Sequence, residues 1–85
     1  MANKYINYST AGTYTIPANE VQKVHINTAV ASNVKLYDGK NISGLPIATY
    51  KASIVEQYFD LNIAVTSGYI TTVLSGNSDV TVTYN

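Results

Sequence analysis

Alternation of apolar and polar residues is the dominant pattern along this chain. In the segment 21–28, one face carries Val24, Ile26 and Thr28, and the other carries Lys23, His25 and Asn27. A period of two residues is typical of a half-buried β-strand, whereas a helix would show apolar residues three and four positions apart. Val, Ile, Thr and Tyr are abundant, and all four favour strands. The pattern therefore predicts an all-β chain.

Turn-forming residues divide the chain into about eight short segments of this kind. The expected strands are 4–8, 13–16, 21–28, 34–37, 46–51 or 47–51, 54–63 or 55–63, 69–74 and 80–84. Strands with one polar face leave that face to solvent and pair antiparallel. We therefore expect residues 1–85 to form a single domain, a small antiparallel β-sandwich that is jelly-roll or Greek-key-like.

The apolar face of each expected strand supplies the predicted core. Its members are Ile16, Val24, Ile26, Val34, Leu36, Ile47, Phe59, Leu61, Ile63, Ile70, Leu74, Val80 and Val82. The same alternation places Tyr37, Tyr50 and Tyr58 on the opposite face, where neighbouring strands would gather them into an outward aromatic patch. A chain of this length buries only roughly 60% of its unfolded surface, so its stability margin is thin.

Charge is the most unusual bulk property of the sequence. Only 12% of residues are Asp, Glu, Lys or Arg, about half the usual share of about 25%, and the net charge is zero. There is no cysteine, so disulfides cannot support the small core. Such a chain is poorly protected against self-association. Two interpretations stay open: partner subunits cover much of the surface, or Asn, Thr and Ser keep it hydrated.

The sequence lacks the groups that catalysis requires. His25 is the only imidazole, and its place in the middle of an alternating strand favours a solvent or interface position over a general base. Glu56 and Asp60 share a strand face, but a four-residue separation of roughly 13 Å is too long for a glycosidase carboxylate pair. The segment 38–41 resembles a turn more than a calcium loop. We expect no enzyme, no cofactor and no metal site.

Other partner classes are also disfavoured. The five lysines are scattered and arginine is absent, so the sequence predicts no nucleic-acid binding. No apolar run approaches the ~20 residues of a membrane span. The first residues lack the basic and apolar regions of a signal peptide, so we expect synthesis in a cytoplasm without Sec export.

Tyrosine is the one positive signal for binding. The chain contains eight, and the combination of an apolar ring and a polar tip suits protein interfaces. Any single tyrosine is also an ordinary strand residue, but as a group they favour an interface. The candidate interface residues are Tyr5, Tyr8, His25, Tyr37, Tyr50 and Tyr58.

Several segments resemble a known group of proteins. They are Val-His-Ile-Asn-Thr-Ala (24–29), Leu-Tyr-Asp-Gly (36–39), Ile-Ala-Thr (47–49), Tyr-Phe-Asp-Leu-Asn-Ile-Ala (58–64), Thr-Ser-Gly (66–68) and Asp-Val-Thr-Val-Thr-Tyr (79–84). Together they resemble small β-sandwich virion proteins of tailed bacteriophages. The resemblance implies a capsid decoration or cement protein that is made in the host cytoplasm and located in the virion. It also implies a homo-oligomer, with a trimer favoured, bound to the major capsid protein or other virion proteins.

A second hypothesis rests on the tyrosine, asparagine and aspartate content. A β-sandwich rich in these residues could be a carbohydrate- or receptor-binding module of a tail or fibre. The sequence does not separate the two hypotheses.

Overall fold

The computed structural model describes residues 4–28, 33–43, 45–51 and 57–85. Its strands are β1 (Lys4–Tyr8), β2 (Gly12–Pro17), β3 (Glu20–Thr28), β4 (Asn33–Asp38), β5 (Leu45–Lys51), β6 (Gln57–Ala64), β7 (Tyr69–Leu74) and β8 (Asp79–Tyr84). Every expected strand is confirmed, and most ends differ by one residue or none. The expected start of the sixth strand, at residue 54 or 55, lies outside the described residues.

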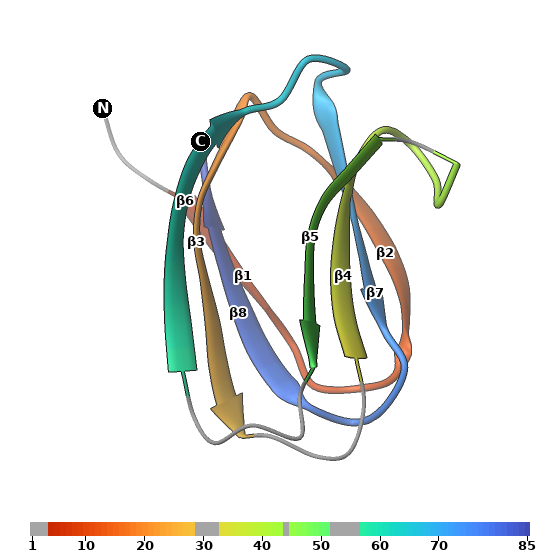
Figure 1. Ribbon diagram of the computed structural model, residues 1–85, viewed down its shortest axis with the longest axis vertical. Coiled ribbons are helices and arrows are strands. Elements are labelled where there is room, and N and C mark those ends of the chain that lie inside the picture. Colours follow the sequence, from red (N-terminus) through yellow and green to blue (C-terminus); the bar gives the residue numbers. More distant parts are fainter. Residues whose placement is uncertain (1–3, 29–32, 44, 52–56) are drawn as a thin grey trace.

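The strands form two facing antiparallel sheets (Figure 1). The first sheet has the order β1-β8-β3-β6, and the second has the order β2-β7-β4-β5. This arrangement is that of a jelly roll, in which two Greek keys wrap around one core. It confirms the expected fold class. The described part of the chain contains no helix, and hence none long and apolar enough to cross a membrane.

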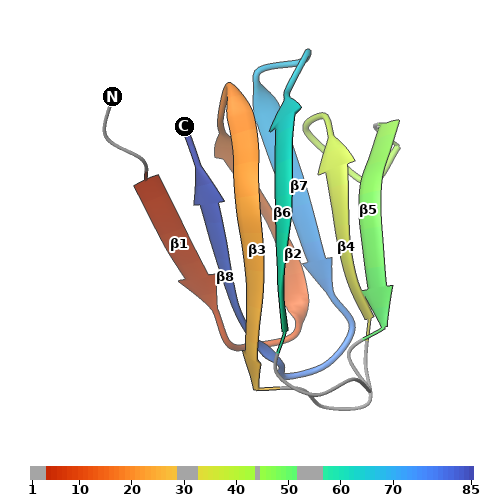
Figure 2. The ribbon, with the colours of Figure 1, turned by 60° about the vertical axis from the view of Figure 1, so that its left-hand side comes forward.

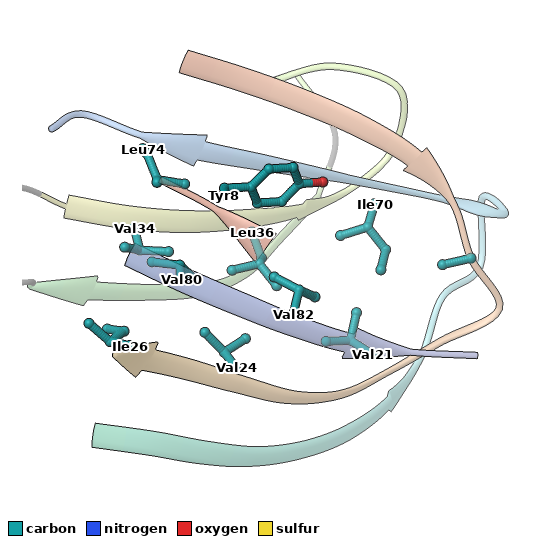
Figure 3. Close-up of a cluster of buried hydrophobic side chains, with 11 residues drawn as sticks. Tyr8, Val21, Val24, Ile26, Val34, Leu36, Ile70, Leu74, Val80 and Val82 are labelled. Atoms are coloured by element: carbon teal, nitrogen blue, oxygen red, sulfur yellow. The ribbon is translucent and has the colours of Figure 1, made fainter. Parts of the chain in front are cut away.

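The space between the sheets is filled by the inward side chains of both (Figure 3). In the first sheet Val24 opposes Val82 and Ile26 opposes Val80, so one face of β3 meets one face of β8. The buried cluster comprises Tyr8, Ala18, Val21, Val24, Ile26, Val34, Leu36, Ile70, Leu74, Val80 and Val82. Complete burial of each Val, Leu or Ile contributes about 1.5–3 kcal/mol.

Most of the predicted core is confirmed. The eight members that are buried are Val24, Ile26, Val34, Leu36, Ile70, Leu74, Val80 and Val82. Ile16, Ile47, Phe59 and Leu61 are half-buried and pack against this cluster. The prediction that Ile63 belongs to the core is wrong, because this residue is 36% exposed. It lies on an edge strand beside Asn62, whose φ of 50° interrupts the extended backbone near the end of β6.

The predicted outward position of Tyr50 is also wrong. Tyr50 opposes Val34 across β5 and β4, and it packs against the core. The cause is an irregularity between Leu36 and Tyr37, after which Tyr37 pairs with Pro46 instead of Ile47. One extra residue in a strand exchanges its two faces, so alternation counted from Ile47 assigns Tyr50 to the wrong face.

Candidate assembly surface

The two broadest sides of the molecule are formed by the edges of the sheets. The molecule measures 30 × 28 × 16 Å, and Figure 1 looks down its shortest axis. Four strands spaced about 4.8 Å apart account for this short dimension, so the edge strands lie at its two ends. We name these two surfaces by their strands. The β1–β2 side comprises Tyr5, Ile6, Tyr8, Tyr14 and Ile16, and the β5–β6 side comprises Leu45, Ile47, Tyr50, Phe59, Leu61 and Ile63.

A stacked pair of tyrosines closes the β1–β2 side. The ring centroids of Tyr8 and Tyr14 are 4.2 Å apart, with planes inclined by 14°. The Tyr14 hydroxyl donates to the Thr10 carbonyl oxygen over 2.6 Å. Gly12 leaves room for the Tyr14 ring, because a Cβ there would lie 3.2 Å from the Tyr14 hydroxyl oxygen. As a result Tyr8 is only 6% exposed.

The environment of the Tyr8 hydroxyl is apolar. Burial, together with the neighbouring Tyr84 and Tyr14, raises the pKa of Tyr8 to about 12. The hydroxyl has no hydrogen-bond partner among the described residues, and neither does the buried Thr72 hydroxyl. An unpaired polar group in a core costs free energy. These two hydroxyls are therefore local weaknesses in an otherwise well-packed interior.

A second aromatic stack lies on the β5–β6 side, but this side is more open. The ring centroids of Tyr50 and Phe59 are 4.1 Å apart, with planes inclined by 16°, and both residues are only half-buried. Burial raises the pKa of Tyr50. Leu45 is 71% exposed at the start of β5, and Ile63 is exposed near the end of β6. The β5–β6 side thus exposes apolar side chains to solvent at the end where β5 begins and β6 ends.

The sequence places two charged residues on β5 and β6, Lys51 and Asp60. The side chain of Lys51 lies outside the described part of the structure, and that of Asp60 is exposed. Its carboxylate lies 3.9 Å from the Lys23 ammonium, and both side chains are more than half exposed, so this pair contributes little stability. Exposed apolar residues such as Leu45 and Ile63 are typical of the centre of a subunit contact.

Hydrogen bonds tie together the turns at the end where β5 begins and β6 ends. The Asp38 carboxylate accepts bonds from the backbone N–H and hydroxyl groups of Thr66 and Ser67, at distances of 2.5–2.9 Å. These donors hold the pKa of Asp38 well below its usual range. The Ala18 N–H donates to the Gly68 carbonyl, and the Val65 N–H donates to the Asn19 carbonyl. Leu45 and Ile63 are therefore attached to a well-connected end of the sandwich.

The loop after β4 leans over the outer face of the second sheet. The Thr71 hydroxyl donates to the Gly39 carbonyl over 2.8 Å, and the Thr15 hydroxyl donates to the Lys40 carbonyl over 3.2 Å. The Lys40 ammonium lies 4.7 Å from the centre of the Tyr69 ring. The loop covers Thr71 completely and leaves Ile42 62% exposed. Within the described residues no three His, Cys, Asp or Glu side chains converge as a metal site would require.

The outer face of the first sheet is polar instead. The Asn7 and Asn27 side-chain amides both donate to the Thr81 hydroxyl, over 3.0 and 3.1 Å. Asn7 also donates to the Asp79 carboxylate over 2.5 Å. The amide and hydroxyl groups of this network bond to one another and keep the outer face of the first sheet polar. Of the two interpretations of the low charge, hydration by Asn and Thr therefore fits this face, and coverage by a partner fits the β5–β6 side.

The structure does not bring the six candidate interface residues together. Tyr5 is 75% exposed on β1, Tyr8 is buried, His25 is exposed on the outer face of β3, Tyr37 is half-buried on β4, and Tyr50 lies on the β5–β6 side. Tyr58 pairs with His25 through the backbone, and its side chain lies outside the described part of the structure. Their role in an interface stays a prediction.

Sequence reasoning missed the exposed aliphatic residues. Leu45 was assigned to no element, because the expected strand begins at residue 46 or 47, and Ile63 was expected in the core. In the structure Leu45 begins β5 and pairs with Asp38 of β4. No local signal distinguishes Ile63, because its exposure follows from the edge position of β6.

No protein-family description matches the chain, and no curated protein sequence matches it either. Solved structures do match. The Drosophila NLP core, described in terms of pentamer formation and histone binding, has a TM-score of 0.64 and 13% identity, covering 100% of this chain and 97% of that one. The nucleoplasmin-like N-terminal domain of Drosophila FKBP39 has a TM-score of 0.62 and 16% identity, covering 95% of this chain and 83% of that one.

These neighbours correct the sequence-based identity. The resemblance to phage virion proteins is wrong, and so are the trimer on a capsid, the capsid-protein partner and the virion location that it implied. The receptor-binding alternative is overturned by the same neighbours. The resemblance was misleading because alternating Val, Ile, Thr and Tyr recur in any small sandwich, whatever its family. The architecture of this chain is a nucleoplasmin-like β-sandwich.

Proposed function

We propose that this chain is the core domain of a ring-shaped homopentamer that binds histones. The proposal rests on the similarity of the whole chain to the Drosophila NLP core. The structure of that protein is described in terms of pentamer formation and histone binding. The proposal assigns binding, and no catalysis, to the chain. It replaces the trimer expected from sequence with a five-membered ring.

Features of this chain support assembly independently. The β5–β6 side carries an exposed leucine and isoleucine beside a half-buried aromatic stack. The chain is small, has no disulfide and carries no net charge. Burial of such a side against another subunit adds apolar contact that one small core cannot supply.

Histone binding must work with little electrostatic attraction from this domain. Its five acidic residues are matched by five lysines, so it creates no net negative field to steer basic partners over long distances. We therefore expect contact-driven binding that depends weakly on salt, because screening acts mainly on separated, exposed charges.

Light scattering coupled to size-exclusion chromatography tests the assembly. The chain has a mass of 9.2 kDa, so a pentamer has about 46 kDa, five times that value. A monodisperse species of this mass supports the ring, whereas a monomer at micromolar concentration rejects it. Co-elution with purified core histones at low and moderate salt then tests binding, with lysozyme as a basic control protein. If the ring binds neither the histones nor lysozyme, or binds the two equally, the proposed histone role is rejected.

A further inference from the structure

We infer that the β5–β6 side of one copy packs against the β1–β2 side of the next copy, with Leu45 meeting Tyr5. This inference rests on the proposed ring and specifies which surfaces build it. The occupant of the β5–β6 side is thus a second copy of this chain. The two sides suit this contact in their size, in their position at the two ends of the short dimension and in their exposed apolar residues.

The size of the β5–β6 side matches that of a stable contact. It is one of the two broad sides of the molecule, and the molecule measures 30 × 28 Å across them. Specific interfaces bury roughly 800 Å² on each partner, an area that a side of these dimensions can supply. The polar outer face of the first sheet is an unsuitable alternative, because Asn7, Asn27 and Thr81 already bond to one another there.

Ring closure requires two different surfaces to meet. A contact of one side with its own copy is isologous and produces a two-fold dimer, whereas a closed five-membered ring needs a head-to-tail contact. The β1–β2 side lies at the other end of the short dimension, so one copy can contact one neighbour through each side, and the ring closes when successive copies are rotated by one fifth of a turn.

The exposed apolar residues of the two sides lie toward the same end of the sandwich. β1 and β5 run in the same direction along the two outer edges in Figure 2. Tyr5 is the second residue of β1 and Leu45 is the first residue of β5, so both lie at the same end of the sandwich. Their exposed fractions are 75% and 71%. A ring whose axis follows the strands places this end of one copy beside the same end of the next copy.

The backbone of the β5–β6 side indicates that a neighbouring copy is contacted through side chains, without strand pairing between copies. Pro46 lacks an N–H donor, and Asn62 has a φ of 50°, so neither edge offers a regular strand for sheet extension. The contact therefore depends on Leu45, Ile63 and the Tyr50–Phe59 stack.

Cysteine cross-linking tests this arrangement, because the natural chain has no cysteine. The double variant Tyr5→Cys and Leu45→Cys, treated with a short bismaleimide, should form a ladder that ends at five linked copies. Either single variant should stay a single band, and a mixture of both single variants should stop at two copies. The matched control is Ser9→Cys with Leu45→Cys, because the exposed Ser9 follows the other end of β1 and should form no ladder.

The possible failures are distinguishable. If the unmodified chain is monomeric by light scattering, the proposed ring itself fails. If the chain is pentameric but the double variant forms no ladder, or if single variants link like with like, the assigned surfaces are wrong. A ladder from the Ser9 control as strong as that from the Tyr5 variant would also overturn the assignment.

A substitution without cross-linking provides a second measurement. Leu45→Lys should reduce the mass from five copies to one at micromolar concentration, because it places a charge in an apolar contact. Ile42→Lys is the control, since Ile42 is 62% exposed on the loop over the outer face of the second sheet. Circular dichroism should show both variants folded. Retention of the pentamer by Leu45→Lys, or its equal loss in Ile42→Lys, would contradict the assignment.

Discussion

The two broad sides of this sandwich differ in how deeply their aromatic residues are buried. Each carries a stacked aromatic pair that fills the gap between the sheet edges, Tyr8–Tyr14 on one side and Tyr50–Phe59 on the other. Tyr8 is buried, whereas Tyr50 and Phe59 remain half-exposed. The difference teaches that the aromatic stack of the β1–β2 side is buried largely within one chain, whereas the stack of the β5–β6 side gains more from a partner.

Removal of the Tyr8 ring should have the largest effect on the protomer. Tyr8→Ala leaves a cavity at the β1–β2 side, and substitutions of this size in a core cost about 3–5 kcal/mol. Urea denaturation should show this loss at all protein concentrations, because the ring is buried within the chain. A loss that appears only in the assembled state would contradict the view that the Tyr8 ring is buried within the chain.

Tyr50→Ala should produce a smaller loss that depends on concentration. In the dissociated protomer the half-buried ring supplies about 1–2 kcal/mol. In the assembly the loss should grow, because ligand-like binding of a neighbouring copy stabilises the folded state. Denaturation at low and high protein concentration measures both values. Identical losses at the two concentrations would show that this side stays open in solution.

Removal of the Tyr8 hydroxyl should change the response to alkaline pH. Burial raises the pKa of Tyr8 from 10.0 to about 12 in the folded chain, so the folded state holds the phenol proton more tightly than the unfolded state does. The associated stability is fully present below pH 10 and is lost as the pH rises through 12. Thermal melts of Tyr8→Phe should therefore fall less steeply than those of the natural chain between pH 10 and 12. Equal slopes would show that the hydroxyl reaches solvent.

Thr72→Val should have the smallest effect, and it should stabilise the chain. The Thr72 hydroxyl is buried without a hydrogen-bond partner among the described residues. Replacement by an isosteric methyl group removes this desolvation cost, so the free energy of unfolding should rise by about 0.5–1 kcal/mol. Chemical denaturation at neutral pH measures the change. Destabilisation would indicate that the hydroxyl has a partner, such as an ordered water.

The sequence predicted far more of the fold than of the surface. The strands and most core positions follow from local alternation, as for Val24 and Ile26, because a side chain's face depends on its immediate neighbours. The candidate interface residues were chosen by type, and type did not reveal that Tyr8 is buried. Residue type also did not identify Leu45 or Ile63 as exposed. Exposure depends on which strand becomes an edge, and that information is not local.

By itself, the sequence determined the secondary-structure class, the approximate strand boundaries and the low charge of this protein. Only the tertiary structure decided the strand order, because β1 pairs with β8 at the other end of the chain, Lys4 opposite Tyr84. It also decided the orientation of Tyr50, through an irregularity between Leu36 and Tyr37 that no alternation pattern reveals. The physical reason is that strand pairing is set by the packing of the whole core, whereas alternation records only which face of each strand that core will contact.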